Sequence, residues 1–97
     1  MEEQNILQQA HEIVYNRSEE KERNYGDFFE SMRRMALIHS TITGEPYNVK
    51  NMYMAMVALK LSREAFKHKE DNILDAIAYL ASMNDYLKLN QNFTQSK

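Results

Sequence analysis

Apolar residues recur at steps of three and four in four stretches of this chain. Such spacing places them on one face of an α-helix, whereas a half-buried strand would need a sustained alternation that no stretch shows. We therefore predict an all-α fold, a compact bundle of four helices at about 5–16, 27–43, 48–66 and 71–89. The connections between these helices are short, which favours antiparallel neighbours.

The predicted helix ends carry residues that usually cap helices. Asn5, Asp27 and Asn48 each precede an apolar periodic stretch, where a side-chain oxygen accepts hydrogen bonds from the first amide groups. Gly44 follows the second stretch and suits the left-handed conformation in which many helices end. These positions support the boundaries of the first three helices.

The third and fourth helices define most of the expected core. The third is strongly apolar and should be central, with apolar residues at Val49, Met52, Tyr53, Met56, Val57 and Leu59. The core face expected on the fourth helix comprises Ile73, Leu74, Ile77, Leu80, Ala81 and Leu87. A different face of that helix carries, at helical steps, Asp71, Asp75, Ala78 and Ser82.

The second helix has an apolar stripe that runs from Phe28 to Ile42 and includes His39. We expect His39 to be partly buried and hydrogen-bonded. A ligand role is the less favoured alternative, because no second His or Cys stands at metal-ligand spacing.

Composition narrows the classes of protein that this chain can represent. Its 97 residues suit one domain, 1–97, with loose ends at 1–4 and 90–97. Only 2 Gly and 1 Pro favour helices over a many-turned β fold. With 0 Cys there is no disulfide, no thiolate nucleophile and no Cys-ligated zinc.

Charge and hydropathy bear on partners and location. The net charge of −2 provides no broad basic surface for nucleic acid. No apolar run approaches the roughly 20 residues of a membrane span, and the start, MEEQN, lacks the basic character of a signal peptide. We expect a cytoplasmic protein that uses neither membrane nor nucleic acid. Its 7 Met and several amphipathic faces favour a homo-oligomer.

A polar cluster surrounds the turn between the third and fourth helices, at residues 67–70. The turn should bring Lys60, Arg63 and Glu64 opposite Asp71 and Asp75. One interpretation is an ion-pair network that fixes the register of two helices, and such pairs contribute little when exposed. A second is a ligand site, and a third is a protein-binding surface.

The ligand interpretation rests on paired carboxylates. Asp71 and Asp75 lie one helical turn apart, and Asp27 and Glu30 form a second pair on the second helix. Carboxylates so spaced can hold Mg²⁺, which also takes phosphate oxygens as ligands. Nearby Lys and Arg side chains would neutralise phosphate charge. No Gly-rich phosphate loop, nucleophile motif or HExxH is present.

The charged segment 17–24 has two interpretations as well. A run of charges usually marks a solvated connection. The alternative is a flap over a ligand, in which Arg17, Lys21 or Arg23 would contact an anion.

Scattered residues over about 6–85 resemble a small all-helical domain often encoded by bacteriophages and prophages, a family without settled function. They are Arg23, Tyr25-Gly26, Glu30, Ala36, Gly44, Lys60, Arg63, His68-Lys69, Asp71, Asp75 and Tyr79. The resemblance implies a viral protein acting in the host cytoplasm. Its densest part is the stretch 60–79.

A more distant similarity is to the MazG-type all-α nucleotide pyrophosphohydrolases, which bind Mg²⁺ through acidic motifs on two helices. Asp75-Ala-Ile-Ala-Tyr79-Leu looks like the end of the second motif, and Asp27-Phe-Phe-Glu30 stands for the first. The usual glutamate three residues before Asp75 is Asn72 here, and a long apolar helix separates the two pairs. These departures count against hydrolysis more than against the fold, and they are compatible with a degenerate member that binds a nucleotide without cutting it or serves as a partner-binding protein.

The resulting hypothesis is a nucleotide or other phosphate-bearing ligand. Its candidate binding residues are Lys60, Arg63, Glu64, His68, Tyr79, Arg23 and Tyr25. Candidate ligands of Mg²⁺ are Asp27, Glu30, Asp71 and Asp75. If a reaction occurs, it is attack of water on a metal-held phosphoanhydride. The alternative is a non-enzymatic inhibitor, adaptor or signalling-nucleotide sponge that acts on a host factor.

Overall fold

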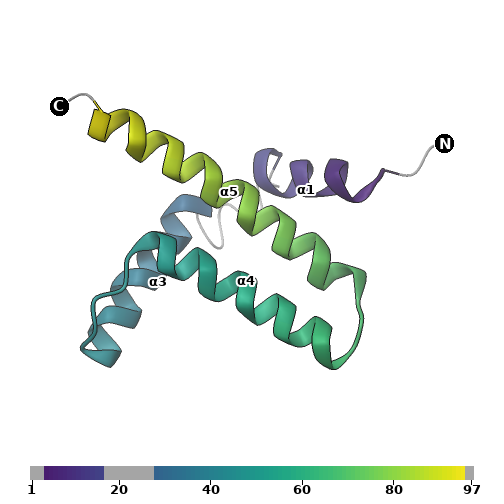
Figure 1. Ribbon diagram of the computed structural model, residues 1–97, viewed down its shortest axis with the longest axis horizontal. Coiled ribbons are helices and arrows are strands. Elements are labelled where there is room, and N and C mark those ends of the chain that lie inside the picture. The colour runs from purple at the N-terminus through teal and green to yellow at the C-terminus, as the bar shows by residue number, and fades with distance from the viewer. Residues whose placement is uncertain (1–3, 17–27, 96–97) are drawn as a thin grey trace.

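The computed structural model describes residues 4–16 and 28–95, with side chains as far as Leu89. Within these residues the chain forms helices only, in agreement with the predicted all-α class. The helices are α1 (Ile6–Tyr15), α3 (Phe28–Thr43), α4 (Val49–Phe66) and α5 (Glu70–Gln95) (Figure 1). Their starts lie within one residue of the predicted ones.

The helix α5 organises the arrangement, because it contacts each of the other three described helices. The longest of these contacts is with α4, and the two run antiparallel as a hairpin that turns at residues 67–69 (Figure 1). The short helix α1 lies along α5, and α3 packs mainly on α4. No described helix is both long and apolar enough to cross a membrane.

Two predicted caps and the predicted stop are present. Asn5 accepts a hydrogen bond from the amide of Gln8 at 2.9 Å, and the Gln8 side chain returns the contact. Asn48 and Asn51 form the same reciprocal box at the start of α4, with an Asn51 amide contact of 2.8 Å. Gly44 follows α3 at a φ of 74°, in the left-handed region. The predicted cap Asp27 lies outside the described residues.

The last helix is longer than expected. It ends at Gln95, whereas the polar stretch from residue 90 was predicted to be loose. Neither Gly nor Pro occurs after residue 89, so nothing in the backbone chemistry opposes further helical turns. Polarity alone was therefore a poor signal for the end of this helix.

The core is built from small and flexible side chains with aromatic rings around them. Its buried members on α3 and α4 are Met32, Ala36, Val49, Met52 and Tyr53. Aromatic residues pack against this cluster, namely Phe28, Phe29, Tyr79 and Tyr86. The hydroxyls of Tyr53 and Ser82 are 2.6 Å apart in a fully buried hydrogen bond that joins α4 to α5. The third predicted helix is thus central as expected, although Leu59 near its end is 38% exposed.

The buried face of α5 differs in part from the prediction. Leu74 is buried as expected, at 9% exposure, but Ile73 and Leu80, also expected in the core, are 37% and 43% exposed, whereas Ala78 and Ser82 are 1% and 0% exposed. Small side chains allow neighbouring helices to approach closely, because the distance between helix axes depends on the residues at the contact. The face that also carries Asp75 therefore packs inward, and the Asp75 side chain is left partly exposed, at 35%.

The apolar stripe of α3 is also only partly buried. Met32 and Ala36 are buried, but Ile42 is 77% exposed. His39 is half-buried as expected and its ring lies 4.0 Å from that of Tyr47, yet its Nδ1 has no hydrogen-bond partner. The expected hydrogen bond of this histidine is therefore wrong at that nitrogen.

Candidate functional site

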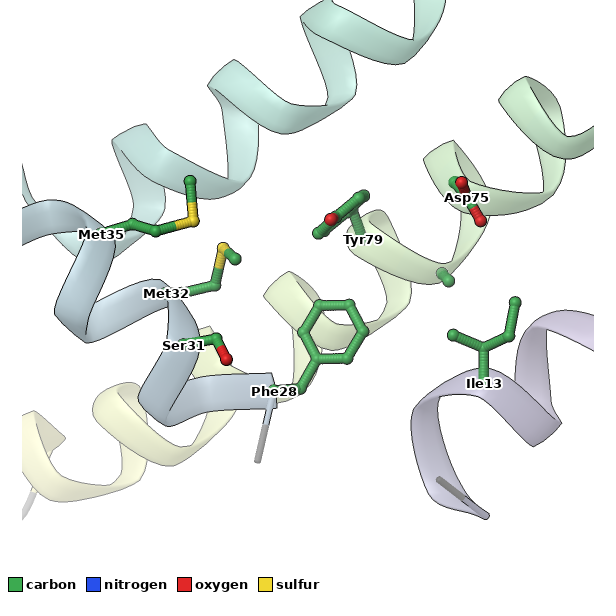
Figure 2. A pocket seen from close by; sticks show the side chains of 8 residues that line it. Ile13, Phe28, Ser31, Met32, Met35, Asp75 and Tyr79 are labelled. Atoms are coloured by element: carbon green, nitrogen blue, oxygen red, sulfur yellow. The ribbon is translucent and has the colours of Figure 1, made fainter. Parts of the chain in front are cut away.

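Asp75 lies in the wall of a partly open pocket of about 250 Å³ that is lined by residues of α1, α3 and α5 (Figure 2). Its position follows from the inward rotation of α5 described above. The remaining wall is mostly apolar. It is formed by Ile13, Phe28, Ser31, Met32, Met35, Ala78 and Tyr79. The pocket thus combines one carboxylate with aromatic rings and thioether sulfurs.

The charge of Asp75 is partly balanced by α4. Lys60 Nζ lies 3.0 Å from Asp75 Oδ2, and the two side chains are 16% and 35% exposed. An ion-pair network across the hairpin was one of the interpretations of the sequence, and among the described residues it is present only as this pair, because Arg63 and Asp71 have no ion-pair partner there. Within the described part of the chain, the other oxygen, Asp75 Oδ1, has neither a hydrogen bond nor an ion pair. One acceptor therefore remains available at the pocket wall.

Two aromatic rings line this pocket, Tyr79 on α5 one helical turn after Asp75 and Phe28 on α3. The rings of Phe28 and Tyr79 lie 5.2 Å apart at 75°, an edge-to-face contact. Phe28 also stacks on the buried ring of Tyr53 at 6.2 Å. Each of the two rings in the pocket wall therefore packs against another aromatic ring.

The hairpin turn is held by Glu64. Its Oε1 accepts hydrogen bonds from the amide of Lys69 at 2.9 Å and from the Asn72 side chain at 3.3 Å, while Oε2 contacts His68 Nδ1. These donors, the Lys69 amide foremost, lower the pKa of Glu64 below its usual range. Glu64 and His68 were predicted as ligand contacts, and the structure shows them bound to each other across the turn.

A second pocket, of about 560 Å³, opens beside this turn. Three cations line it, Arg63, Lys67 and Lys69, and among the residues described none of them has an ion-pair partner. Phe66 also lines the pocket with a side chain that is 93% exposed. A basic concavity with an exposed aromatic ring can attract an anion and offer a stacking surface at the same point.

The predicted site residues are therefore divided between two places. Asp75 and Tyr79 line the first pocket, between α1, α3 and α5, which we call the inner pocket. Arg63 lines the pocket at the turn, and Lys60 reaches the inner pocket only through its ion pair with Asp75. Phe66, Lys67 and Lys69 line the pocket at the turn but were not among the predicted binding residues. The sequence pattern also did not predict that residues of α3 would line the pocket beside Asp75, because this depends on how α3 crosses α5.

The proposed magnesium ligands are not assembled among the described residues. Glu30 and Asp71 are exposed, and the described part of the chain contains no group of three or more His, Asp or Glu side chains that could hold a metal ion. Asp27, Arg23 and Tyr25 lie outside the described residues, as does the charged segment 17–24. Magnesium binding stays a prediction.

Fold and pockets define a class: a small all-α domain in which an antiparallel hairpin presents a carboxylate to one partly open pocket and cations to another. Within this class the chain belongs to the DUF6378 family, described as a domain of unknown function, which it matches over residues 5–87. That span agrees with the expected resemblance to a helical domain without settled function. Comparisons with curated proteins and with solved structures gave no match.

Proposed function

We propose that this domain binds a nucleotide, with the phosphate end held at the turn of the α4–α5 hairpin. The observation that carries the proposal is the pocket lined by Arg63, Lys67 and Lys69, whose charges no described acid neutralises. Guanidinium groups pair with phosphate through two parallel hydrogen bonds, and ammonium groups add compact charge. Glu70 and Asp71 follow at the start of α5, where the helix dipole favours them, and neither lines this pocket.

The exposed ring of Phe66 supports a ligand that has an apolar part as well as charge. Phe66 is 93% exposed, so its ring makes little contact with the core. Contact with an apolar group of a ligand would remove that surface from water. A nucleotide carries the carbons of its sugar next to the phosphate, whereas inorganic phosphate supplies only the charge.

We further propose a phage origin and a distant relation to the MazG-type enzymes, acting in the host cytoplasm. The resemblance of Asp75–Leu80 to their second acidic motif supports this, and Glu30 stands in the first turn of α3. Pairing with Lys60 weakens Asp75 as a metal ligand, because the ammonium group already neutralises its charge. This favours binding without hydrolysis, and Mg²⁺ would enter with the phosphates.

Thermal denaturation with a panel of nucleoside mono-, di- and triphosphates tests the proposal, with and without Mg²⁺. A ligand at 100 times its Kd should stabilise the fold by about 2.7 kcal/mol. Arg63→Met with Lys67→Met should abolish that gain, and the exposed Lys50→Met is the matched control. No stabilisation by any nucleotide would refute the proposal.

Release of pyrophosphate in the same samples separates the two forms of the proposal. Turnover that requires Mg²⁺ and is lost in Asp75→Asn supports a pyrophosphohydrolase. Stabilisation without turnover supports a nucleotide-binding protein or sponge.

A second candidate is a protein-interaction role, including self-association. On α3, Leu37, Ile38 and Ile42 are 68%, 50% and 77% exposed. We expect a homo-oligomer in light scattering that Ile42→Glu disrupts. A wild-type monomer that captures a host protein would favour the adaptor or inhibitor role instead.

A further inference from the structure

We propose that the inner pocket recognises the base of the nucleotide, and that it selects flat heterocycles carrying an exocyclic amine. The amine donates a hydrogen bond to Asp75 Oδ1, the oxygen that Lys60 leaves unoccupied. This inference rests on the proposed nucleotide binding and adds the part of the ligand that sets specificity. Adenine, cytosine and guanine carry such an amine, whereas uracil and thymine do not.

Volume and wall chemistry exclude the phosphates from this pocket. A cavity of about 250 Å³ lies below the roughly 300–1,000 Å³ of sites for larger ligands, and it suits a single ring system. Phosphate next to a carboxylate would meet like charge, and the apolar wall offers nothing to replace its hydration. The same wall favours an apolar ring that brings one donor.

The pair with Lys60 decides which kind of donor fits. Lys60 already brings one positive charge to Asp75 at 3.0 Å, so a second cation at the other oxygen would meet repulsion. A neutral N–H meets none and still forms a charge-assisted hydrogen bond with the carboxylate. An amino-substituted base therefore fits this oxygen better than Mg²⁺ or an alkyl ammonium group.

Aromatic and sulfur contacts complete the match to a planar ring. Phe28 and Tyr79 present an edge-to-face pair to the pocket, and a further ring can extend such an arrangement at 4.5–7 Å between centroids. Met32 and Met35 line the same space (Figure 2), and thioethers make favourable contacts with ring edges and adapt to their shape. A fatty ligand would use the apolar wall but would leave the acceptor of Asp75 without a donor.

The test compares nucleosides, which carry no phosphate and so address the inner pocket alone. Adenosine is compared with purine riboside, which lacks only the exocyclic amine, and cytidine with pyrimidin-2-one riboside. Titrations followed by NMR should give each amino compound an affinity about tenfold higher than its partner, as expected for one hydrogen bond to a charged group. This comparison on the unaltered protein needs no variant.

Two variants then locate the effect. Asp75→Ala should remove the difference between adenosine and purine riboside, while Glu70→Gln, an exposed acid on the same helix, should retain it. If Asp75→Ala does not fold, Ile13→Trp narrows the pocket from α1 without touching Asp75 and should weaken both nucleosides. Equal affinity for the two members of a pair, or a difference that survives Asp75→Ala, would overturn the inference.

The outcome also separates this inference from the function on which it rests. Nucleotides that bind through Arg63 and Lys67 while no nucleoside binds would overturn base recognition and leave nucleotide binding intact. Failure of both nucleotides and nucleosides would overturn both.

Discussion

The ion pair between Lys60 and Asp75 should contribute measurably to stability, and unequally from its two sides. Double-mutant cycles on exposed pairs give about 0.2–1 kcal/mol, whereas removing one partner of a fully buried pair costs about 3–5 kcal/mol. With side chains 16% and 35% exposed, this pair lies between those limits. We expect the single substitutions to cost about 1–2 kcal/mol each.

The asymmetry follows from exposure. Asp75→Asn leaves an ammonium group that is 16% exposed without its counterion, and Lys60→Met leaves a carboxylate that water reaches more easily at 35%. The methionine also keeps the apolar stem of the lysine in contact with the helix. Asp75→Asn should therefore be the more destabilising of the two.

Urea denaturation followed by circular dichroism measures these free energies on the single variants, the double variant and wild type. The double variant should cost less than the sum of the singles by about 1 kcal/mol, because residues in contact are not additive. Lys50→Met, an exposed change on the same helix, should remain within about 0.5 kcal/mol of wild type. If each single substitution changes the free energy of unfolding by less than about 0.5 kcal/mol and the two changes add up in the double variant, the pair is not a stabilising contact.

Three further contacts give predictions of their own. Tyr53→Phe should cost about 1–2 kcal/mol in urea denaturation, because it leaves the buried Ser82 hydroxyl without its partner. The Tyr15 hydroxyl donates a hydrogen bond to Asp85 and so connects α1 to α5, and Tyr15→Phe should therefore speed hydrogen exchange in α1. The same hydrogen bond raises the pKa of Tyr15, so this pKa should fall in Asp85→Asn, as measured by ultraviolet titration. Glu64 has a lowered pKa when folded, so its contribution is present above the ordinary value of 4.5 and is lost as the pH falls through the folded value. The stability difference between wild type and Glu64→Gln should therefore shrink on acidification below that value, and a constant difference would contradict this.

Local sequence patterns were sufficient to predict the four helices and the residues at which they begin. The caps at Asn5 and Asn48 and the stop at Gly44 act through neighbours within a few residues, so their chemistry is legible in sequence. The end of α5 was missed because no breaker follows it. Tertiary packing, rather than any local preference, decides where such a polar stretch stops being helical.

The buried face of α5 could not be read from hydrophobicity. Periodicity placed Ile73 and Leu80 in the core, yet the helix packs through Ala78 and Ser82. Close packing favours small side chains at helix contacts, because they let the helices approach. The hydroxyl of Ser82 is satisfied by the buried Tyr53 hydroxyl on α4, and this partner cannot be predicted from the pattern on α5. The sequence thus located the pair Lys60–Asp75 correctly but not the pocket that its carboxylate lines.

The division of the polar cluster changes what its charges do. A charged pair turned inward is weak support for stability, because apolar residues of similar volume often stabilise a core equally well or better. The pair does, however, hold Asp75 at the wall of a pocket with one oxygen unoccupied. Among the described residues, the three cations that line the pocket at the turn, around Phe66, have no ion-pair partner. If the domain binds a nucleotide as we propose, the two pockets would contact different ends of it, a hydrogen-bond donor at Asp75 and phosphate at the turn.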